Sequence, residues 1–186
     1  MTAPRRVPVV ATLVVSLAVM TMIGLGVWQL KRLAWKEALL ARYAAAGSAS
    51  APVAWPEGAK AAEPLLYRRT ALDCRAVASI DAMAGRSADG RSGWAVVARC
   101  AQPQARVVLG WAPGPASLPG WAGGPVTGWL APGPRLVADP PLAGLAANAR
   151  PDPSEIPNNH LAYAVQWFLF ALTALVIYVL ALARRR

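Results

Sequence analysis

LAYAVQWFLFALTALVIYVLALA, residues 161–183, is an uncharged run long enough to cross a membrane as a helix. A second uncharged run, VPVVATLVVSLAVMTMIGLGV, occupies residues 7–27. At about 1.5 Å per helical residue, each run spans a hydrocarbon layer of roughly 30 Å. We therefore predict two transmembrane helices, at residues 7–28 and 160–183. A cleaved signal peptide is the alternative for the first run, although that run is longer than the usual apolar core of such a peptide.

The basic residues at the two ends of the chain predict its orientation. Arg5 and Arg6 precede the first run, and three arginines, residues 184–186, follow the second. Under the positive-inside rule, residues 1–6 and 184–186 are expected in the cytoplasm. The intervening segment is then expected in the periplasm, which makes the chain a multi-pass protein of a bacterial inner membrane. Despite the net charge of +10, there is no basic helix with interleaved aromatic residues, so nucleic acid is not an expected partner.

The segment between the two runs divides by composition. Trp28, Arg32 and Trp35 recur at helical spacing, which predicts that the first helix continues beyond the membrane. The expected boundaries are 29–46 for this helical extension, 47–63 for a linker, 64–137 for a β domain and 138–159 for a Pro-rich return segment. The predicted fold class is an α+β membrane protein in which two transmembrane helices flank a small, mainly antiparallel β domain.

Short stretches rich in β-branched and aromatic residues, separated by Gly/Pro-rich turns, predict the strands of this domain. The stretches are YRRTALDCRAV (67–77), GWAVVARC (93–100), ARVVLGWAP (105–113) and GGPVTGWLAP (123–132). The dipeptide Gly-Trp occurs four times, ending at Trp94, Trp111, Trp121 and Trp129. Its irregular spacing argues against a repeat, and we expect these dipeptides at junctions between turns and strands.

Two cysteines, Cys74 and Cys100, each fall in a predicted strand. In an oxidising compartment they are able to form a disulfide, and the alternative is a pair of unbonded small residues in the core. Their spacing is not that of a C-x-x-C motif, which disfavours thiol exchange. A copper site is also disfavoured, because one histidine and four methionines offer few soft ligands.

The sequence does not carry the motifs of common enzymes. It contains neither a P-loop nor a G-x-S-x-G motif, and one histidine is available for any catalytic triad or metal site. The acidic residues are scattered along the chain rather than paired. The expected function is therefore not enzymatic.

His160, the only histidine, is expected where the second helix enters the membrane. Pro157 ends the extended segment and Asn158 or Asn159 caps the helix, which places His160 in its first turn. Because the first helix leaves the membrane where the second enters, residues of both helices meet at one boundary. The candidate set from the two helices is Gly26, Trp28, Gln29, Arg32, His160, Tyr163 and Trp167.

Two interpretations fit this boundary. A planar amphipathic ligand such as haem would take the imidazole as its axial ligand, the aromatic rings against its faces, and Arg32 or Lys36 at its propionates. The other interpretation is an ordinary interfacial belt, in which Trp and Tyr lie at the headgroups and the basic side chains extend to water.

LGVWQLKRLAWKEALL, residues 25–40, and PNNHLAYAVQWF, residues 157–168, strongly resemble the surfeit locus protein 1 family. Between them, YRR at 67–69, GWAVVA at 93–98 and VVLGWAP at 107–113 follow in the order expected for that family. The two end motifs are long and specific, whereas the middle ones are weak by themselves.

The resemblance implies an assembly factor for cytochrome c oxidase, anchored by two helices around a domain outside the cytoplasm. Bacterial members are thought to bind haem a and to help supply it to the catalytic subunit, so the implied partners are oxidase subunit I and other assembly factors. The family's functional histidine corresponds to His160, which the resemblance implies as the axial ligand of the haem iron. Its Gly-x-Trp motif corresponds to Gly26 and Trp28.

The chain departs from the family pattern in its outer domain. The loop is short, the Asn-Arg pair usual before Gly-Trp is replaced in VVLGW, and Cys74 and Cys100 are not part of the pattern. Two alternatives therefore stay open beside haem delivery. One is a scaffold without a cofactor that stabilises an oxidase assembly intermediate, and the other is a membrane-tethered periplasmic enzyme.

Overall fold

The computed structural model describes residues 8–48, 51–114 and 120–184. It divides into two compact units, one formed by residues 1–39 with 157–186 and the other by residues 40–156. The expected cytoplasmic ends, residues 1–6 and 184–186, lie outside the described residues except for Arg184.

The chain forms three α-helices, seven strands and two short 3-10 helices within the described ranges. The helices are α1 (Val9–Ser48), α2 (Ala59–Ala62) and α3 (His160–Arg184). The strands are β1 (Val53–Ala54), β2 (Arg69–Cys74), β3 (Ala76–Arg86), β4 (Ser92–Gln102), β5 (Ala105–Ala112), β6 (Gly124–Ala131) and β7 (Arg135–Ala138). The 3-10 helices are η1 (Glu63–Leu65) and η2 (Pro153–Glu155).

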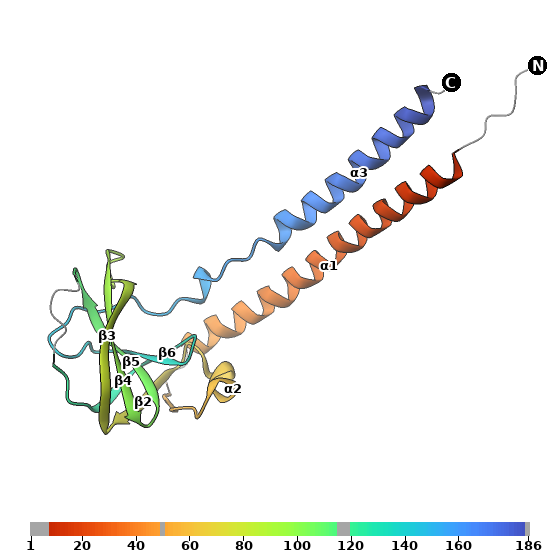
Figure 1. Cartoon of the computed structure of the whole chain (residues 1–186). Helices are drawn as coiled ribbons and strands as arrows, with labels where there is room; N and C mark the ends of the chain where they lie inside the picture. Colours follow the sequence, from red (N-terminus) through yellow and green to blue (C-terminus); the bar gives the residue numbers. More distant parts are fainter. Residues whose placement is uncertain (1–7, 49–50, 115–119, 185–186) are drawn as a thin grey trace, which may run out of the picture. The chain divides into compact units, whose positions relative to one another are not determined.

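Helices α1 and α3 run side by side in opposite directions (Figure 1). Their less exposed residues recur at spacings of three and four, as expected for two helices packed along one seam. In α1 these residues include Thr12, Val15, Val19, Met22, Gly26, Gln29, Leu33 and Lys36. In α3 they include His160, Ala164, Trp167, Ala171, Ala174 and Tyr178. At the far end of the seam, the hydroxyls of Thr12 and Tyr178 are hydrogen-bonded to each other.

The outward faces of the helix pair are apolar. Leu13 is 65% exposed and Ile177 is 62% exposed, and the other large apolar side chains of the two runs are similarly uncovered. Exposed apolar surface of this extent is typical of contact with lipid rather than water. Both helices are long and apolar enough to cross a membrane. The predicted fold class, two such helices flanking a sheet domain, is confirmed.

The second unit is built on a mixed, largely antiparallel sheet of seven strands in the order β1-β2-β6-β7-β5-β4-β3. Two pairs, β1 with β2 and β5 with β7, are parallel, and the other pairs are antiparallel. A single residue, Arg75, separates β2 from β3 although these strands lie near opposite edges of the sheet. The sheet must therefore curl until its two edges meet.

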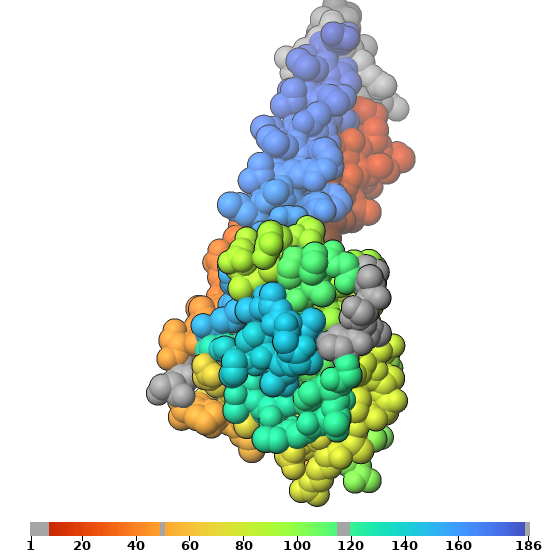
Figure 2. All heavy atoms as spheres, turned by 90° about the vertical axis from the view of Figure 1, so that its left-hand side faces the viewer, coloured from red at the N-terminus to blue at the C-terminus, as the bar shows by residue number. Residues whose placement is uncertain are grey.

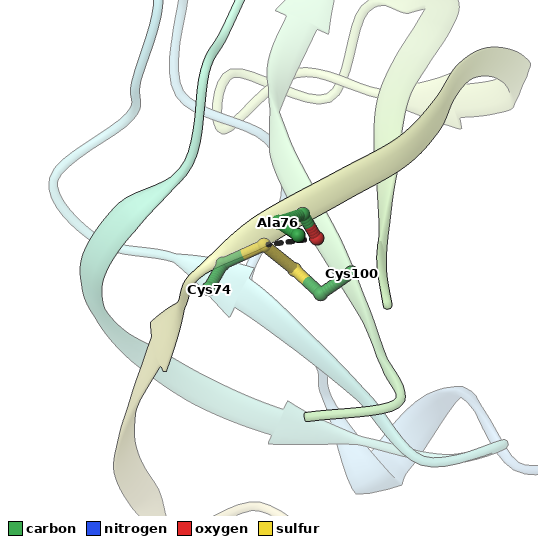
Figure 3. The surroundings of a disulfide bond; sticks show 3 residues. All are labelled: Cys74, Ala76 and Cys100. Carbon is green, nitrogen blue, oxygen red and sulfur yellow. Dashed lines mark hydrogen bonds between the residues drawn. A yellow bond between two sulfur atoms is a disulfide. The ribbon is translucent and has the colours of Figure 1, made fainter. Parts of the chain in front are cut away.

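Near this closure a disulfide joins Cys74, at the end of β2, to Cys100 in β4, the strand beside the edge strand β3 (Figure 3). The Arg75 backbone N–H donates a hydrogen bond of 2.9 Å to the Gln102 carbonyl at the same place. Both cysteines are buried. Of the two alternatives that the sequence left open, the structure has the bonded one.

The core lies inside the curled sheet and follows the two-residue period of its strands. The buried residues of this main cluster are Leu72, Cys74, Val96, Ala98, Cys100, Val107, Leu109, Val126, Leu136 and Ala138. A second, smaller cluster contains Ala95, Val97, Val108, Ala131 and Val137. The return segment closes this core, because Leu142 and Leu145 pack against it and the Leu142 N–H donates to the Leu109 carbonyl. In Figure 2 this segment, in light blue, covers part of the visible face of the sheet domain.

Strand β3 was not anticipated as an element of its own. Its sequence, AVASIDAMAGR, is rich in small residues, and its burial alternates weakly because it is paired along one side with β4. The Asp89-Gly90 pair in the following turn was the available signal, since Gly90 adopts a φ of +80° and such pairs favour tight hairpins. Part of the expected linker is also ordered, because β1 pairs with β2 and Pro56 is buried.

Three of the four Gly-Trp dipeptides lie in strands β4, β5 and β6. Gly93-Trp94 follows the first residue of β4 and Gly110-Trp111 precedes the last residue of β5, so these two lie near strand ends, as expected. Gly128-Trp129 lies farther inside β6. Glycine is required there by close approach. A Cβ on Gly93 would lie 2.5 Å from the Trp111 ring, and one on Gly128 would collide with the Val137 carbonyl of β7. Neighbouring indoles and backbones therefore occupy the space that a side chain would need.

We expect the double variant Cys74→Ala/Cys100→Ala to lower the free energy of unfolding of the outer domain. The bond closes a loop with a sequence separation of 26. The chain-entropy model then gives a stabilisation of about 3.5 kcal/mol. Guanidinium denaturation of the full chain in detergent, followed by tryptophan fluorescence, measures this difference. A midpoint unchanged from that of the parent protein would contradict it.

Candidate functional site

His160 begins α3 and its ring meets α1. The Tyr163 N–H donates to the Asn159 carbonyl at 3.2 Å, which sets the first turn of the helix after Pro157. The expected side-chain cap is not formed by Asn158, whose Oδ1 is buried without a hydrogen-bond partner among the described residues. His160 Nδ1 lies 2.7 Å from Oε1 of Gln29. The two helices are therefore joined by polar groups where the sequence placed the candidate site.

The contact with Gln29 selects a tautomer of the neutral imidazole. An amide oxygen accepts hydrogen bonds, so the N–H at Nδ1 of His160 donates a hydrogen bond to Gln29 Oε1. In the neutral ring this tautomer has its lone pair on Nε2. A histidine held in this way through one nitrogen is oriented to bind a metal through the other.

Gly26 lies one turn before Gln29, and its position is filled by α3. A Cβ on Gly26 would lie 2.6 Å from Cε1 of Phe168. Gly24, by contrast, has no atom within 4 Å of the corresponding position. Gly26, rather than Gly24, therefore receives the neighbouring helix, and it receives an aromatic ring.

The basic residues near the site have partners within the protein. Lys36 Nζ donates a hydrogen bond of 2.6 Å to the carbonyl of Pro157, just before α3 begins. The Arg32 guanidinium lies over the ring of Trp35, 4.0 Å from its centroid. Lys36 thus ties the approach of α3 to α1, while Arg32 keeps N–H groups that a ligand carboxylate is able to engage.

The aromatic candidates divide into two groups. Trp28 is 55% exposed and Tyr163 is 51% exposed, so both lie on outward faces of their helices. Trp167 is half-buried and packs edge-on against Phe170 at a centroid distance of 6.1 Å. The structure therefore joins His160 to Gln29 and packs Gly26 against Phe168, and it leaves Trp28 and Tyr163 exposed on their helices.

This arrangement fits a haem in its donor chemistry. Haem needs one axial nitrogen, flat apolar surroundings and a cation for its carboxylates, and His160, Trp167 and Arg32 supply these types of group. No cluster of three or more His, Cys, Asp or Glu side chains occurs in the described part of the chain, so the site does not resemble a multidentate metal site. A single imidazole nitrogen is the donor on which any cofactor binding at this site would depend.

Sequence reasoning named the interhelical residues but not the contact of Phe168 with Gly26. Phe168 follows His160 by two helical turns, and Gly26 precedes Gln29 by one. The His160–Gln29 pair alone does not predict this contact, because eight residues of α3 rise about 12 Å and three residues of α1 about 4.5 Å. The contact also depends on the tendency of helical side chains to point back toward the N-terminus of their helix.

Comparison with known families finds one match across most of the chain. The model described as SURF1 family matches residues 16–172. That range contains every residue of the candidate site. No curated protein and no solved structure matches the chain.

Proposed function

This chain belongs to the SURF1 family of cytochrome c oxidase assembly factors, and on that premise we propose that it binds haem a through His160 and helps deliver it to oxidase subunit I. The family is one of assembly factors rather than enzymes, and its partners are components of the oxidase and of its assembly.

The observation that carries the proposal is the 2.7 Å contact between His160 Nδ1 and Gln29 Oε1. It leaves Nε2 as a lone-pair donor of fixed orientation at the end of the helix pair. When bound, haem a supplies an iron that accepts this nitrogen and a porphyrin that rests on apolar surface. Trp28, Tyr163 and Trp167 offer aromatic contact around the imidazole, and Arg32 offers charge for a propionate.

Delivery requires that the protein release what it binds. His160 stands at the first residue of α3 and is only half-buried, so the ligand is held at an open margin rather than in an enclosed cavity. A single protein ligand at such a margin is more easily exchanged than two ligands on opposite faces of the iron. These features support transfer to a partner subunit rather than permanent storage.

We place the protein in a bacterial inner membrane, with α1 and α3 crossing it and the sheet domain in the periplasm. The arginines at the chain ends and the apolar outer faces of the helices support this topology. The disulfide also supports it, because such bonds persist in oxidising compartments.

A scaffold without a cofactor is the second candidate. It is favoured by the Phe168 ring at Gly26 and by the Lys36 bond to Pro157, since both groups already have protein partners. In that case the boundary residues stabilise the helix pair, and the protein holds an oxidase intermediate through its outer domain.

Optical spectroscopy separates the two candidates. Deletion of the gene is expected to lower the haem a absorbance of the membranes while other cytochromes stay intact. The full chain, purified from cells that make haem a, is expected to show a Soret band with about one haem per protein. A purified chain without that band, together with the deletion effect, would support the scaffold instead.

A further inference from the structure

The outer unit contains a second candidate site, a hollow of about 400 Å³. A volume of this size falls within the range of small-ligand sites. We call it the Tyr43–Tyr67 hollow. Its lining comes from the last turns of α1, the turn before β2 and the return segment, and it includes Tyr43, Gly47, Tyr67, Arg150 and Asp152.

Tyr67 is held in an unusual conformation at this hollow. Its φ of +67° is a left-handed value that a bulky residue adopts rarely and at a cost in free energy. The residue is 3% exposed, and its N–H donates to the Leu130 carbonyl at 2.8 Å, which anchors the turn to β6. The ring lies 5.0 Å from that of Tyr43 with an interplanar angle of 44°, so the two rings form an aromatic corner.

The guanidinium of Arg150, which lines the hollow, already has two partners within the protein. Arg150 donates a hydrogen bond of 2.7 Å to the Gly47 carbonyl, and its guanidinium lies 3.3 Å from the centroid of the Trp129 ring. A guanidinium stacked and bonded in this way positions the end of α1 against the return segment. It is therefore poorly placed to serve as the main receptor of an anion.

The negative charge of the hollow belongs to Asp152, and the positive charge of Arg150 acts on it. Asp152 makes no ion pair with any residue in the described ranges, whereas the neighbouring Glu155 is paired with Arg86. The Ser154 N–H donates to Asp152 Oδ1 at 2.8 Å, and this bond lowers the pKa of the carboxyl. Burial raises the pKa of Tyr67, and the negative charges of Asp152 and Glu155 add to that effect. The hollow thus combines an ionised carboxylate with two aromatic rings.

We propose that the Tyr43–Tyr67 hollow binds the cationic head of a lysine or arginine side chain of a partner polypeptide, with Asp152 as counter-ion and the tyrosine rings as its walls. Aromatic corners beside a carboxylate attract ammonium and guanidinium groups through the ring quadrupole and the charge together. A polypeptide is the expected source of the cation because the family acts on protein partners. This site is independent of haem binding, and failure of either proposal leaves the other standing.

The test is a titration of the full chain in detergent micelles, with NMR detection of ring-labelled tyrosines. The probes are N-acetyl-arginine amide, N-acetyl-lysine amide and the neutral isostere N-acetyl-citrulline amide. We expect saturable shifts at Tyr43 and Tyr67 with the two cations, while Tyr163 and Tyr178 of α3 stay unchanged. Citrulline is expected to bind at least about tenfold more weakly, which corresponds to about 1.4 kcal/mol.

Asp152→Asn tests the counter-ion, because asparagine keeps the acceptor that caps η2 and removes the charge. We expect this variant to bind N-acetyl-arginine amide at least about fivefold more weakly, in the range of one charge-assisted contact. Asp89→Asn, at an exposed carboxylate in the β3–β4 turn, is the matched control and should bind as the parent does. Equal binding of arginine and citrulline, or the absence of saturable shifts, would overturn the proposal.

Discussion

Replacing His160 by alanine is expected to remove haem a from the purified protein while the chain remains in the membrane. The substitution takes away the nitrogen proposed to bind the iron, but it leaves the apolar runs of α1 and α3 unchanged. We expect haem content to fall about tenfold or more, since losing an axial bond removes well over 1.4 kcal/mol of binding free energy. The ratio of Soret absorbance to protein measures the loss.

Two companion variants show whether the effect is specific. Gln29→Leu keeps His160 but removes the acceptor of its Nδ1 proton, and loss of such an orienting partner weakens metal binding about 10- to 100-fold. Leu161→Ala changes an exposed neighbour in the same helical turn and should leave haem content as in the parent. If haem stays bound at the parental level in the His160→Ala protein, the imidazole is not the ligand.

The two long apolar helices can be predicted from the sequence, because an uncharged run of this length forms few other stable structures. The helical spacing of Trp28, Arg32 and Trp35 also predicts that α1 continues beyond the apolar run, and it extends to Ser48. Strand β3 is less readable, because an alanine-rich edge strand has neither strong alternation nor β-branched residues. The curl of the sheet depends on pairing between distant strands, which local pattern does not encode.

In the candidate site, the sequence predicts which residues lie near one another but not which of them are in contact. Topology alone brings residues near positions 26–32 and 160–167 to one boundary, so the members of the site are predictable. Which of them touch depends on the rotation of each helix about its axis and on their sliding along each other. That choice makes Gln29 the partner of His160 and turns Trp28 and Tyr163 outward.

Gly26→Leu is expected to disrupt the helix pair and with it the haem site. Even a Cβ at this position would lie 2.6 Å from Phe168, and the rest of a leucine side chain extends farther into the ring. Overpacking of this kind costs about 1–3 kcal/mol and forces the helices apart or rotates them. Because Gln29 follows one turn later, the displacement reaches its bond with His160, and haem content should fall about tenfold for each 1.4 kcal/mol.

The matched control is Gly24→Leu, which inserts the same side chain two residues earlier, where no atom lies within 4 Å. It should retain haem and the parental spacing of the helices. That spacing is measurable without haem, by electron spin resonance distances between labels at the exposed positions Leu13 and Val179.

The double variant Gly26→Leu/Phe168→Ala tests the cause of the effect, because it removes the ring that the leucine displaces. We expect it to recover both the label distance and much of the haem content, since the new side chain then occupies the volume that Phe168 leaves. Equal losses in the Gly24 and Gly26 variants would mean that added bulk anywhere on α1 is harmful. Equal losses in the single and double variants would mean that Phe168 does not set the distance between the helices at Gln29 and His160.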